Sequence, residues 1–443
     1  LNDFRVSAIT KINKNKKFRD YYYNSAKEML DGLVGNEIAM QKKINLSIQM
    51  PKDNKSMLPM HSDIYAGESP FEVVVWIPLM NIKKSTKIYL CSPSGIFTGG
   101  PMCMHQLGFF LKNTLNLNVY MHYVPVKKKY RNLENPIHEN FRHLNLEIAE
   151  KIENEEDNIV ISPEDFFFLN YIKKFTKIRK IIWWLSLDNH YPSFYHVNYN
   201  KFTRFFINLP FYFIRSFNKF TNNYKGISTY AEYSKFLYRI FHKQDLLIAS
   251  SALLNLSQSN YVHKYLLKLN YKSEELYDFL EDKFFESIDL NIINKENIIC
   301  YNPAKATDFI NLFIKKNKQL KFVPLVNMSR EDLLNTLIKS KIYIDFGTHP
   351  GRDRIPREAV LLGNCILTNR KGSANNPVDI SIPDKFKFEE TENNMKTLNN
   401  IIDDIFDDYS EQFKNFLPYQ LNVKNEKNIF KRQAIKIFNS KDL

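Results

Sequence analysis

One stretch near the carboxyl end of the chain, residues 343–368, constrains the fold more than any other. It reads Tyr-Ile-Asp-Phe-Gly-Thr-His-Pro-Gly-Arg-Asp-Arg-Ile-Pro-Arg-Glu-Ala-Val-Leu-Leu-Gly-Asn-Cys-Ile-Leu-Thr. Two apolar runs flank a loop of glycines and arginines. Pro356 stands where a helix would make its first turn, which suits proline because the first amides of a helix have no intrahelical partner. The pattern predicts a buried strand, a loop, a helix that begins near Ile355, and a second buried strand.

The side chains of this stretch are suited to binding an anion. The free amides at the start of a helix and the guanidinium groups of three arginines form a seat for a phosphate or diphosphate. A glutamate one turn into the helix is placed to accept hydrogen bonds from sugar hydroxyls. The pattern favours a nucleotide site in an α/β fold over a solvated basic loop. The candidate binding residues are Gly347, His349, Gly351, Arg352, Arg354, Arg357 and Glu358.

A second glycine-rich turn lies in the amino-terminal part of the chain. An apolar strand is predicted at 87–92, followed by a turn that contains Gly99 and Gly100, a helix at 102–112 and a strand at 118–123. Strand, turn, helix and strand form a βαβ unit, and ligands bind at the carboxyl ends of such strands. The chain is therefore expected to be an α/β protein with two Rossmann-like domains that face a cleft.

Five windows resemble bacterial glycosyltransferases with the two-Rossmann GT-B fold. They occur in the family's order and cover about residues 86–410. The resemblance implies that the carboxyl-terminal half binds a nucleotide-sugar donor and that the amino-terminal half binds the acceptor, a cell-surface polysaccharide, glycan or lipid-linked glycan. Family members often carry an earlier glutamate in the donor loop, where this chain has Pro350. The windows are residues 99–107, 181–189, 257–261, 301–305 and 343–368.

The predicted domain organisation has four parts. An amino-terminal segment precedes an acceptor domain with an aromatic and basic insert at 201–220, a nucleotide-sugar domain, and a helical tail that packs back on the acceptor domain. The corresponding ranges are 1–85, 86–275, 290–410 and 411–443.

The amino-terminal segment does not fit the transferase plan. Residues 57–88 resemble the first iron-binding strands of 2-oxoglutarate/Fe(II) dioxygenases linked to carbohydrate clusters. His61 and Asp63 would supply two ligands of a facial triad, which needs a third. The segment is interpreted as a truncated, dioxygenase-like, β-rich fragment without oxygenase activity. A hydrogen-bonded His–Asp pair on a strand is the favoured reading of the two residues themselves.

The insert 201–220 is dense in phenylalanine, with lysine and arginine between the rings. Such a segment can lie in a membrane interface, with its cations toward anionic headgroups. The alternative is a helix packed on its own domain or across a dimer. The insert is too short and too charged to span a bilayer.

Charge and cysteine content restrict the partners and the compartment. The formal net charge of +14 favours an acidic partner, but no zinc-finger, RNP or helix-turn-helix motif points to nucleic acid. The four cysteines lie far apart and read as buried free thiols in a reducing cytoplasm. We expect a cytoplasmic protein, or one bound peripherally at the inner face of the membrane.

Glycosyl transfer requires a neutralised diphosphate and a base for the acceptor hydroxyl. We expect no catalytic metal and no cofactor, since Lys305 and the arginines of the second half can neutralise the diphosphate. His105 and Asp188 are the candidate bases. Retention or inversion of the anomeric configuration stays open. Two other functions stay open as alternatives: an Fe(II)/2-oxoglutarate oxygenase acting on carbohydrate, and a non-catalytic glycan-binding or scaffold protein.

Overall fold

The computed structural model describes residues 2–25, 27, 86–221, 227, 229–241, 250–281, 285 and 295–439. Contacts divide the chain into two units, Leu1–Lys83 and Lys84–Leu443. In the first unit the structure describes two helices, α1 (Asn2–Lys14) and α2 (Lys16–Ser25). His61 and Asp63, with nearly all of the dioxygenase-like stretch, lie outside the described residues.

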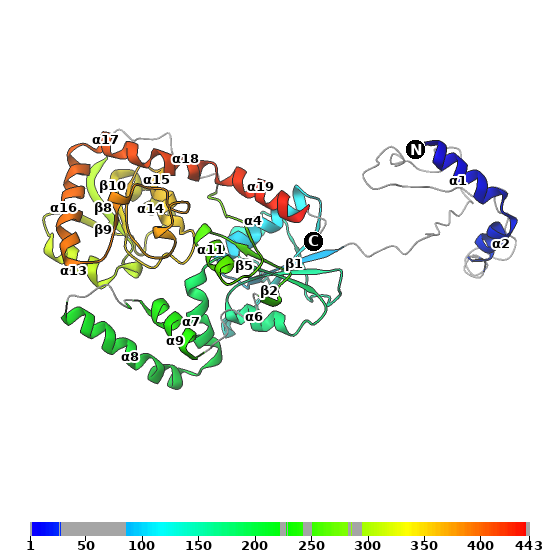
Figure 1. Cartoon of the computed structure of the whole chain (residues 1–443), viewed down its shortest axis with the longest axis horizontal. Helices are drawn as coiled ribbons and strands as arrows, with labels where there is room; N and C mark the ends of the chain where they lie inside the picture. Colours follow the sequence, from blue (N-terminus) through cyan, green and yellow to red (C-terminus); the bar gives the residue numbers. More distant parts are fainter. Residues whose placement is uncertain are drawn as a thin grey trace. The chain divides into compact units, whose positions relative to one another are not determined.

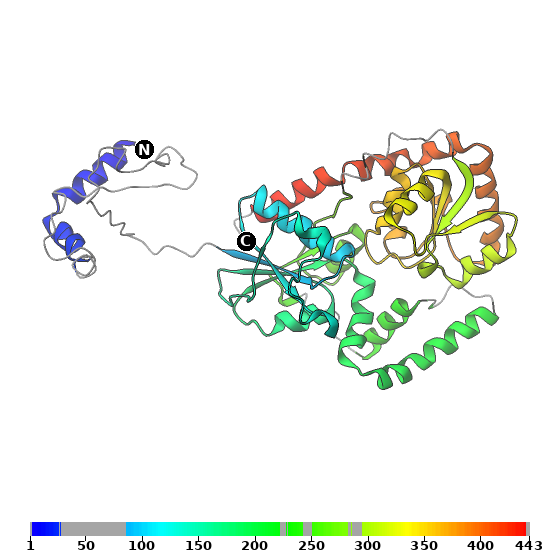
Figure 2. The same cartoon turned by 180° about the vertical axis from the view of Figure 1, so that it is seen from behind.

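The second unit is built on two parallel sheets (Figures 1 and 2). The sheet of its first half has seven strands in the order β3-β2-β1-β4-β5-β6-β7. Every pairing between neighbouring strands is parallel. The strands are β1 (Lys87–Pro93), β2 (Asn118–Val124), β3 (Glu147–Ile148), β4 (Ile159–Pro163), β5 (Arg179–Trp184), β6 (Leu254–Ser257) and β7 (Ser273–Glu275).

The central strands of this sheet are buried on both faces, as their unbroken apolar sequences require. Trp183 and Trp184, at the end of β5, lie on opposite faces of the sheet. Trp183 packs in the core that contains α4, and its indole nitrogen donates to the carbonyl of Leu276 at 3.0 Å. Trp184 packs in the core of the opposite face and donates to Asn255 Oδ1 at 2.9 Å. Both tryptophans are therefore core residues.

Helices cover both faces of the seven-stranded sheet. The longest of them, α8, carries the aromatic insert and lies away from the sheet, at the outer edge of the unit in Figures 1 and 2. The helices of this half are α4 (Gly99–Asn113), α5 (Glu139–Arg142), α6 (Phe166–Lys173), α7 (Leu187–Asn198), α8 (Lys201–Phe220), α9 (Tyr230–Phe241) and α11 (Asn260–Lys268), with a 3-10 turn η3 (Lys128–Tyr130).

The second half has a five-stranded parallel sheet in the order β12-β11-β10-β8-β9. Its strands are β8 (Glu296–Tyr301), β9 (Lys321–Pro324), β10 (Ser340–Asp345), β11 (Cys365–Asn369) and β12 (Lys387–Phe388). Its helices are α13 (Asp308–Lys316), α14 (Arg330–Lys339), α15 (Arg354–Leu361) and α16 (Glu392–Asp407), with 3-10 turns η5 (Pro303–Lys305), η6 (Gly372–Asn375) and η7 (Asp384–Phe386).

The carboxyl-terminal helices connect the two halves. The segment α17 (Tyr409–Phe413), η8 (Lys414–Phe416) and α18 (Leu417–Lys424) packs in the core of the second half. Helix α19 (Glu426–Phe438) returns to the first half, where Phe430 and Ile437 join the core around β1 and α4. The tail therefore buries apolar side chains in both cores.

The predicted α/β class with two Rossmann-like parallel-sheet domains is confirmed. Burial of the four free cysteines is also confirmed. No helix among the described residues is long and apolar enough to cross a membrane.

The chain pattern also predicts a helix at 142–153, and this prediction is wrong: the end of α5 and the short edge strand β3 take its place. An apolar run predicts a strand at 245–250, of which only Ser250 lies among the described residues, and Ser250 is helical; the strand beside β5 is β6. An acidic and polar stretch predicts a hinge at 272–296, but its residues 273–275 form strand β7, which pairs with β6.

Candidate active site

The junction of the two halves is formed by the carboxyl ends of their central strands. In the second half, β10 lies between β8 and β11 and leads through residues 346–353, named here the 346–353 loop, into α15. Asp345 ends β10 with a buried carboxylate. It accepts hydrogen bonds from the Tyr343 hydroxyl at 3.0 Å and from the Gly347 amide at 3.2 Å. The start of the loop is thereby fixed to the strand.

A charged cluster lies directly behind this loop. Lys305 follows β8, the neighbour of β10, so its side chain reaches the same sheet edge. Its Nζ is 2.8 Å from Asp353 Oδ2 and 3.7 Å from Asp345 Oδ2. His349, also buried, has Nδ1 at 3.1 Å from Asp353 Oδ2 and Nε2 at 3.6 Å from Asp345 Oδ1. Two carboxylates thus share one lysine and one imidazole.

The charges of this cluster favour the charged forms of Lys305, His349 and Asp353. Burial lowers the pKa of Lys305, but Asp345 and Asp353 outweigh it and the net shift is upward. The same two carboxylates outweigh burial at His349, so the pKa of its imidazole is raised. At Asp353 burial is opposed by Lys305 and His349, and the pKa of the carboxyl falls to about 2.

The same residues are the metal-ligand candidates of the described chain. One ligand atom from each of Asp345, His349 and Asp353 can be chosen so that all lie within 4.8 Å of one another. The ammonium group of Lys305 contacts two of these three residues. A lysine is therefore built into the place where a divalent cation would neutralise the carboxylates.

Gly347 is required by the close approach of Lys305. A Cβ on Gly347 would stand 2.7 Å from Lys305 Cβ and 3.1 Å from its carbonyl oxygen. Any side chain here would push the loop away from the lysine. Glycine is needed here because of this close contact and not because of a positive φ angle.

Glu358, one turn into α15, is buried and paired with two arginines. Arg330 at the start of α14 donates to both carboxylate oxygens, at 2.8 and 3.2 Å. Arg354, one turn earlier on α15, donates to Oε1 at 3.3 Å. Arg330 is about half exposed while Glu358 is buried. The carboxylate therefore lies beneath two cationic groups that reach toward the surface.

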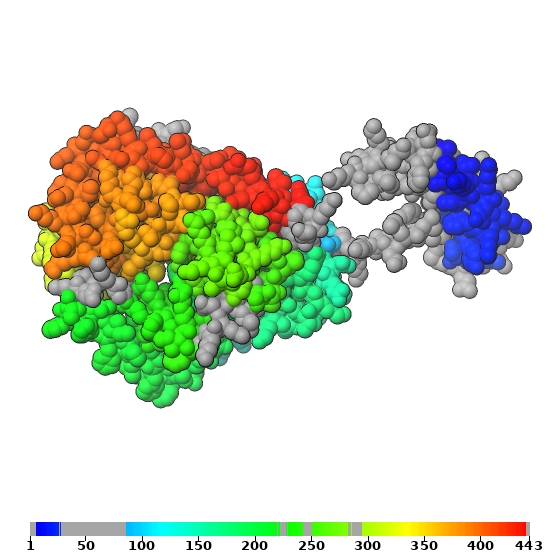
Figure 3. Space-filling view, in the orientation of Figure 1, coloured from blue at the N-terminus to red at the C-terminus, as the bar shows by residue number. Residues whose placement is uncertain are grey.

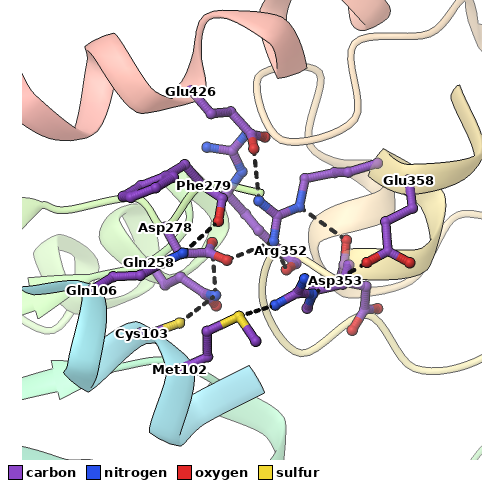
Figure 4. Close-up of polar contacts among 12 residues, drawn as sticks. Met102, Cys103, Gln106, Gln258, Asp278, Phe279, Arg352, Asp353, Glu358 and Glu426 are labelled. Carbon is purple, nitrogen blue, oxygen red and sulfur yellow. Dashed lines mark hydrogen bonds and ion pairs between the residues drawn. The ribbon is translucent and has the colours of Figure 1, made fainter. Parts of the chain in front are cut away.

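Arg352 and Arg357 are placed differently from Arg354. Arg357 is buried and bonds Asp278 Oδ2 at 2.7 Å and Glu426 Oε2 at 2.8 Å. Arg352 bonds Glu426 Oε1 at 2.6 Å (Figure 4). Asp278 belongs to the first half and Glu426 begins α19, so these arginines join the two halves to the returning tail. Arg352 and Arg357 are also buried, whereas Lys305, Arg330 and Arg354 are partly exposed.

The first half meets the 346–353 loop at the ends of β5 and α4. The amide of Leu187 donates to the carbonyl of Pro350 at 2.9 Å. A Cβ on Gly351 would collide with the carbonyl oxygen of Leu185 and stand 2.8 Å from Gln258 Oε1, so this contact needs glycine. Arg354 contacts the sulfur of Met102 on α4. The two strand-to-helix turns predicted from the glycines therefore meet.

Gly99 and Gly100 open α4 at this junction. A Cβ on Gly99 would stand 3.9 Å from Arg354 Cδ, and one on Gly100 would stand 3.6 Å from Leu185 Cδ1. Thr98, the N-cap residue, makes no side-chain cap hydrogen bond. The amino-terminal ends of α4 and α15 therefore lie beside each other at the junction of the halves.

The two candidate bases lie in different surroundings. His105 is buried on α4, stacked on Phe141 at 3.8 Å, with Nδ1 2.7 Å from the Pro101 carbonyl oxygen and Nε2 2.8 Å from the Tyr123 hydroxyl. Burial lowers the pKa of His105 to about 4. Both ring nitrogens are thus engaged within the first half.

Asp188 lies in the first turn of α7, next to Leu187, whose amide bonds the 346–353 loop. Its carboxylate is 3.0 Å from Lys235 Nζ and accepts from the Tyr261 hydroxyl at 3.2 Å. Of the two candidate bases, Asp188 lies at the contact between the halves.

Three residues of this region were not foreseen. Arg330 is the first residue of α14 and looks in sequence like many surface arginines. Glu164 follows β4, accepts from the Leu185 amide at 2.9 Å, and has its pKa raised by burial to about 7. Glu390 follows β12 and accepts from Asn369, whose amide also donates to the Gly347 carbonyl at 2.9 Å. The sequence feature that could have identified both glutamates is the position of an acidic residue just after a strand.

Comparison with known proteins gives likenesses of fold only. No family model and no curated protein matches the chain. It is similar to HepE from Anabaena in complex with UDP-glucose, at 11% identity and TM-score 0.46, covering 80% of this chain and 99% of that chain. Sucrose-phosphate synthase from Thermosynechococcus elongatus has 11% identity and TM-score 0.46, covering 80% and 98%. The lipopolysaccharide outer core galactosyltransferase WaaB has 13% identity and TM-score 0.43, covering 78% and 99%. At this level of similarity, residue roles rest on the contacts described above.

Proposed function

We propose that the protein is a glycosyltransferase that moves a sugar from a nucleotide-sugar donor to a cell-surface polysaccharide or other glycan acceptor. The observation that carries the proposal is the start of α15, where Lys305, Arg330 and Arg354 surround uncapped helix amides beside the first half. Helix amides and guanidinium groups together favour a phosphate or diphosphate. The first half supplies the opposite wall for an acceptor.

Each polar residue of this end has a proposed part in donor binding. Arg330 and Arg354, which both donate to the carboxylate of Glu358, turn from it to the diphosphate. Glu358 then accepts hydrogen bonds from the ribose hydroxyls. Glu390, buried beside Asn369, is a second carboxylate suited to a sugar hydroxyl. Gly347, His349 and Gly351 shape the loop, while Arg352 and Arg357 hold the halves together.

The chemistry needs no metal ion in this proposal. The bond between the sugar carbon and the diphosphate oxygen breaks, a bond to the acceptor oxygen forms, and the acceptor proton passes to a base. Negative charge grows on the leaving diphosphate, and fixed cations stabilise such charge at little reorganisation cost. Lys305 is held in place by Asp345 and Asp353 and carries a raised pKa, so it supplies one of these cations.

Asp188 is the proposed base for the acceptor hydroxyl. It lies one residue from the contact between the halves, whereas both ring nitrogens of His105 are engaged inside the first half. Lys235 and the Tyr261 hydroxyl hold its carboxylate in position. Asp188→Asn would then lower the rate of transfer and leave donor affinity unchanged.

We propose that the protein acts in the cytoplasm and attaches peripherally to the inner face of the membrane. A lipid-linked glycan acceptor would be presented there. The feature that supports attachment is the aromatic and basic helix α8 of the first half. The acceptor is accordingly proposed to be a glycan or lipid-linked glycan rather than a nucleic acid.

The test is calorimetric titration with UDP-, GDP-, CMP- and dTDP-sugars in metal-free buffer. One of them should bind, and Glu358→Ala should weaken its binding by roughly 1–3 kcal/mol, the cost of losing hydrogen bonds to a charged group. The matched control is Glu392→Ala, which removes an exposed glutamate of the same half. If Glu358→Ala binds the donor as the unmodified protein does, the assignment of the donor site is wrong.

A further inference from the structure

The carboxylate of Asp188 is held by two side chains that come from two different helices. Lys235 on α9 donates to Oδ1 at 3.0 Å, and the Tyr261 hydroxyl on α11 lies 3.2 and 3.3 Å from the two carboxylate oxygens. Lys235 also donates to the Tyr261 hydroxyl at 3.3 Å. The orientation of the buried Asp188 carboxylate therefore depends on where α9 and α11 hold these two groups.

Asp379 of the second half fixes the first turn of α11. It is 3% exposed, and its two carboxylate oxygens accept from the backbone amides of Asn260 and Tyr261, each at 2.8 Å. The side-chain amide of Asn376 donates to Asn260 Oδ1 at 3.0 Å. In the space-filling view the residues around α11, in light green, adjoin the second half, in orange (Figure 3). The residue whose amide binds Asp379 is thus the one whose hydroxyl binds Asp188.

The second half also contacts α9, at a longer distance. Lys371 Nζ lies 3.4 Å from Oε1 of Glu232, which stands in the first turn of α9. The other carboxylate oxygen of Glu232 accepts from the Thr229 amide at 3.0 Å, as in a capping box. Lys235 follows Glu232 by three positions, so the two side chains lie on the same face of α9. The ion pair therefore holds the turn of α9 that carries Lys235.

Both contacts come from one segment of the second half, residues 369–379. This segment is bonded to the 346–353 loop. The backbone amide and the hydroxyl of Ser373 donate to the carbonyls of His349 and Gly351, at 2.8 and 2.5 Å. The loop leads in turn to the proposed donor site at the start of α15. The groups that hold the proposed base are thus connected to the half that is proposed to bind the donor.

We propose that Asp379 and Glu232 are positioning residues for the transfer reaction. Asp379 fixes Tyr261, and Glu232, through its ion pair with the second half, fixes the turn of α9 that carries Lys235. Together they hold the Asp188 carboxylate in place beside the contact between the halves. The inference rests on the proposed function, because it requires Asp188 to be the base.

The same contacts also join the two halves, so a purely structural role is the rival explanation. A structural residue affects the protein whether or not the base is present, whereas a positioning residue acts only through the base. Residues that act as a unit in catalysis have strongly non-additive effects. Removing the base therefore separates the two roles.

The first experiment compares Asp379→Ala, Asp188→Asn and the double variant. Donor affinity is measured by calorimetry with the nucleotide-sugar that binds among the UDP-, GDP-, CMP- and dTDP-sugars. The rate is the release of nucleoside diphosphate from that donor, with glucose, galactose and N-acetylglucosamine as soluble acceptors. Asp379→Ala should lower kcat about 10- to 100-fold, as expected for a catalytic group displaced by about 1 Å, and leave the donor Kd unchanged.

In the Asp188→Asn background, Asp379→Ala should lower the remaining rate no further. The matched control is Asp408→Ala, which removes an aspartate that caps α17 within the second half. This control should keep the kcat and the donor Kd of the unmodified protein.

Two milder variants test the same role if Asp379→Ala does not fold. Asp379→Asn keeps the volume and one acceptor for the two backbone amides. Glu232→Gln keeps an acceptor for the Thr229 amide and removes the charge that faces Lys371. Each should lower kcat by a smaller factor and leave the donor Kd unchanged. Glu147→Gln, which breaks an exposed ion pair of the first half, is the control.

An unchanged kcat in the Asp379 variants would overturn the proposal, as would an equal loss of rate with and without Asp188. A loss of donor affinity that accounts for the whole effect would assign Asp379 to the donor site instead. The proposed function fails in a different way, which is visible without any change at Asp379: none of the four nucleotide-sugars binds, or Asp188→Asn keeps the full rate. In either case there is no base at Asp188 to position, and the positioning role falls as well.

Discussion

Replacing Arg357 by Met should destabilise the protein strongly while leaving the donor end of α15 intact. The guanidinium is about 1% exposed and contacts two buried carboxylates, Asp278 at 2.7 Å and Glu426 at 2.8 Å. Glu426 keeps Arg352 at 2.6 Å after the substitution, whereas Asp278 keeps only the amide of Gln258 at 3.0 Å. One carboxylate is then buried without a cation.

The expected loss is about 3–5 kcal/mol of unfolding free energy, as is usual when one partner of a buried ion pair is removed. Methionine fills much of the volume, so a cavity contributes little to the loss. Burial raises the pKa of Asp278, but Arg357, together with smaller contributions from Arg352 and Arg354, outweighs burial, and the net shift of the pKa is downward. Without Arg357, no cation in direct contact offsets the burial of the Asp278 carboxylate.

Urea unfolding followed by circular dichroism measures the effect. The double variant Arg357→Met with Asp278→Asn should be more stable than Arg357→Met alone, since asparagine is neutral and still accepts from Gln258. Arg370→Met is the control: its partner Asp384 is exposed and 3.5 Å away, so the change should be about 0–1 kcal/mol. A variant Arg357→Met that keeps its stability and loses donor binding would refute the structural role and return Arg357 to the phosphate.

Three further outcomes are expected. Transfer should persist in excess EDTA, because Lys305 supplies a fixed cation; loss of activity that Mn²⁺ restores would contradict this. The raised pKa of His349 means that its contribution to stability is complete below its unfolded pKa of about 6.5 and is lost as pH rises through the folded value. Urea midpoints of the unmodified protein should therefore fall relative to those of His349→Gln above about pH 6.5, and a difference independent of pH would count against the cluster. Gly351→Ala should cost about 1–3 kcal/mol by overpacking against Leu185, measured by urea unfolding beside an exposed control, Ser410→Ala; no difference between the two would contradict the contact.

The strands that sequence predicted well are those that are buried on both faces. The strand expected at 118–123 corresponds to β2 within one residue, and the buried strand expected at the start of the stretch 343–368 is the end of β10. Their sequences are mostly apolar because helices cover both sides of a parallel sheet. A strand that is buried on both faces can therefore be recognised from its own residues alone.

The strands that were missed lack that signal. β6 has four residues, and Asn255 and Ser257 are buried polar residues that bond other strands and side chains. β3 has two residues and both are exposed at the sheet edge. Each of these segments is a strand because it pairs with a neighbouring strand. The sequence of the segment itself does not show which strand lies beside it.

The three arginines of this stretch have different partners, and their positions in the sequence do not reveal the difference. Arg352, Arg354 and Arg357 lie within six positions, and pattern alone assigned all three to phosphate. The partners of Arg357 are 79 and 69 positions away, so nothing local distinguishes it. Helix geometry does separate neighbours, because successive residues turn by about 100°. Glu358 therefore faces Arg330 and Arg354, while Arg357 faces Asp278 and Glu426. One turn of α15 thus has two sides: one carries the charged residues that are proposed to bind the donor, and the other joins the two halves through Arg357.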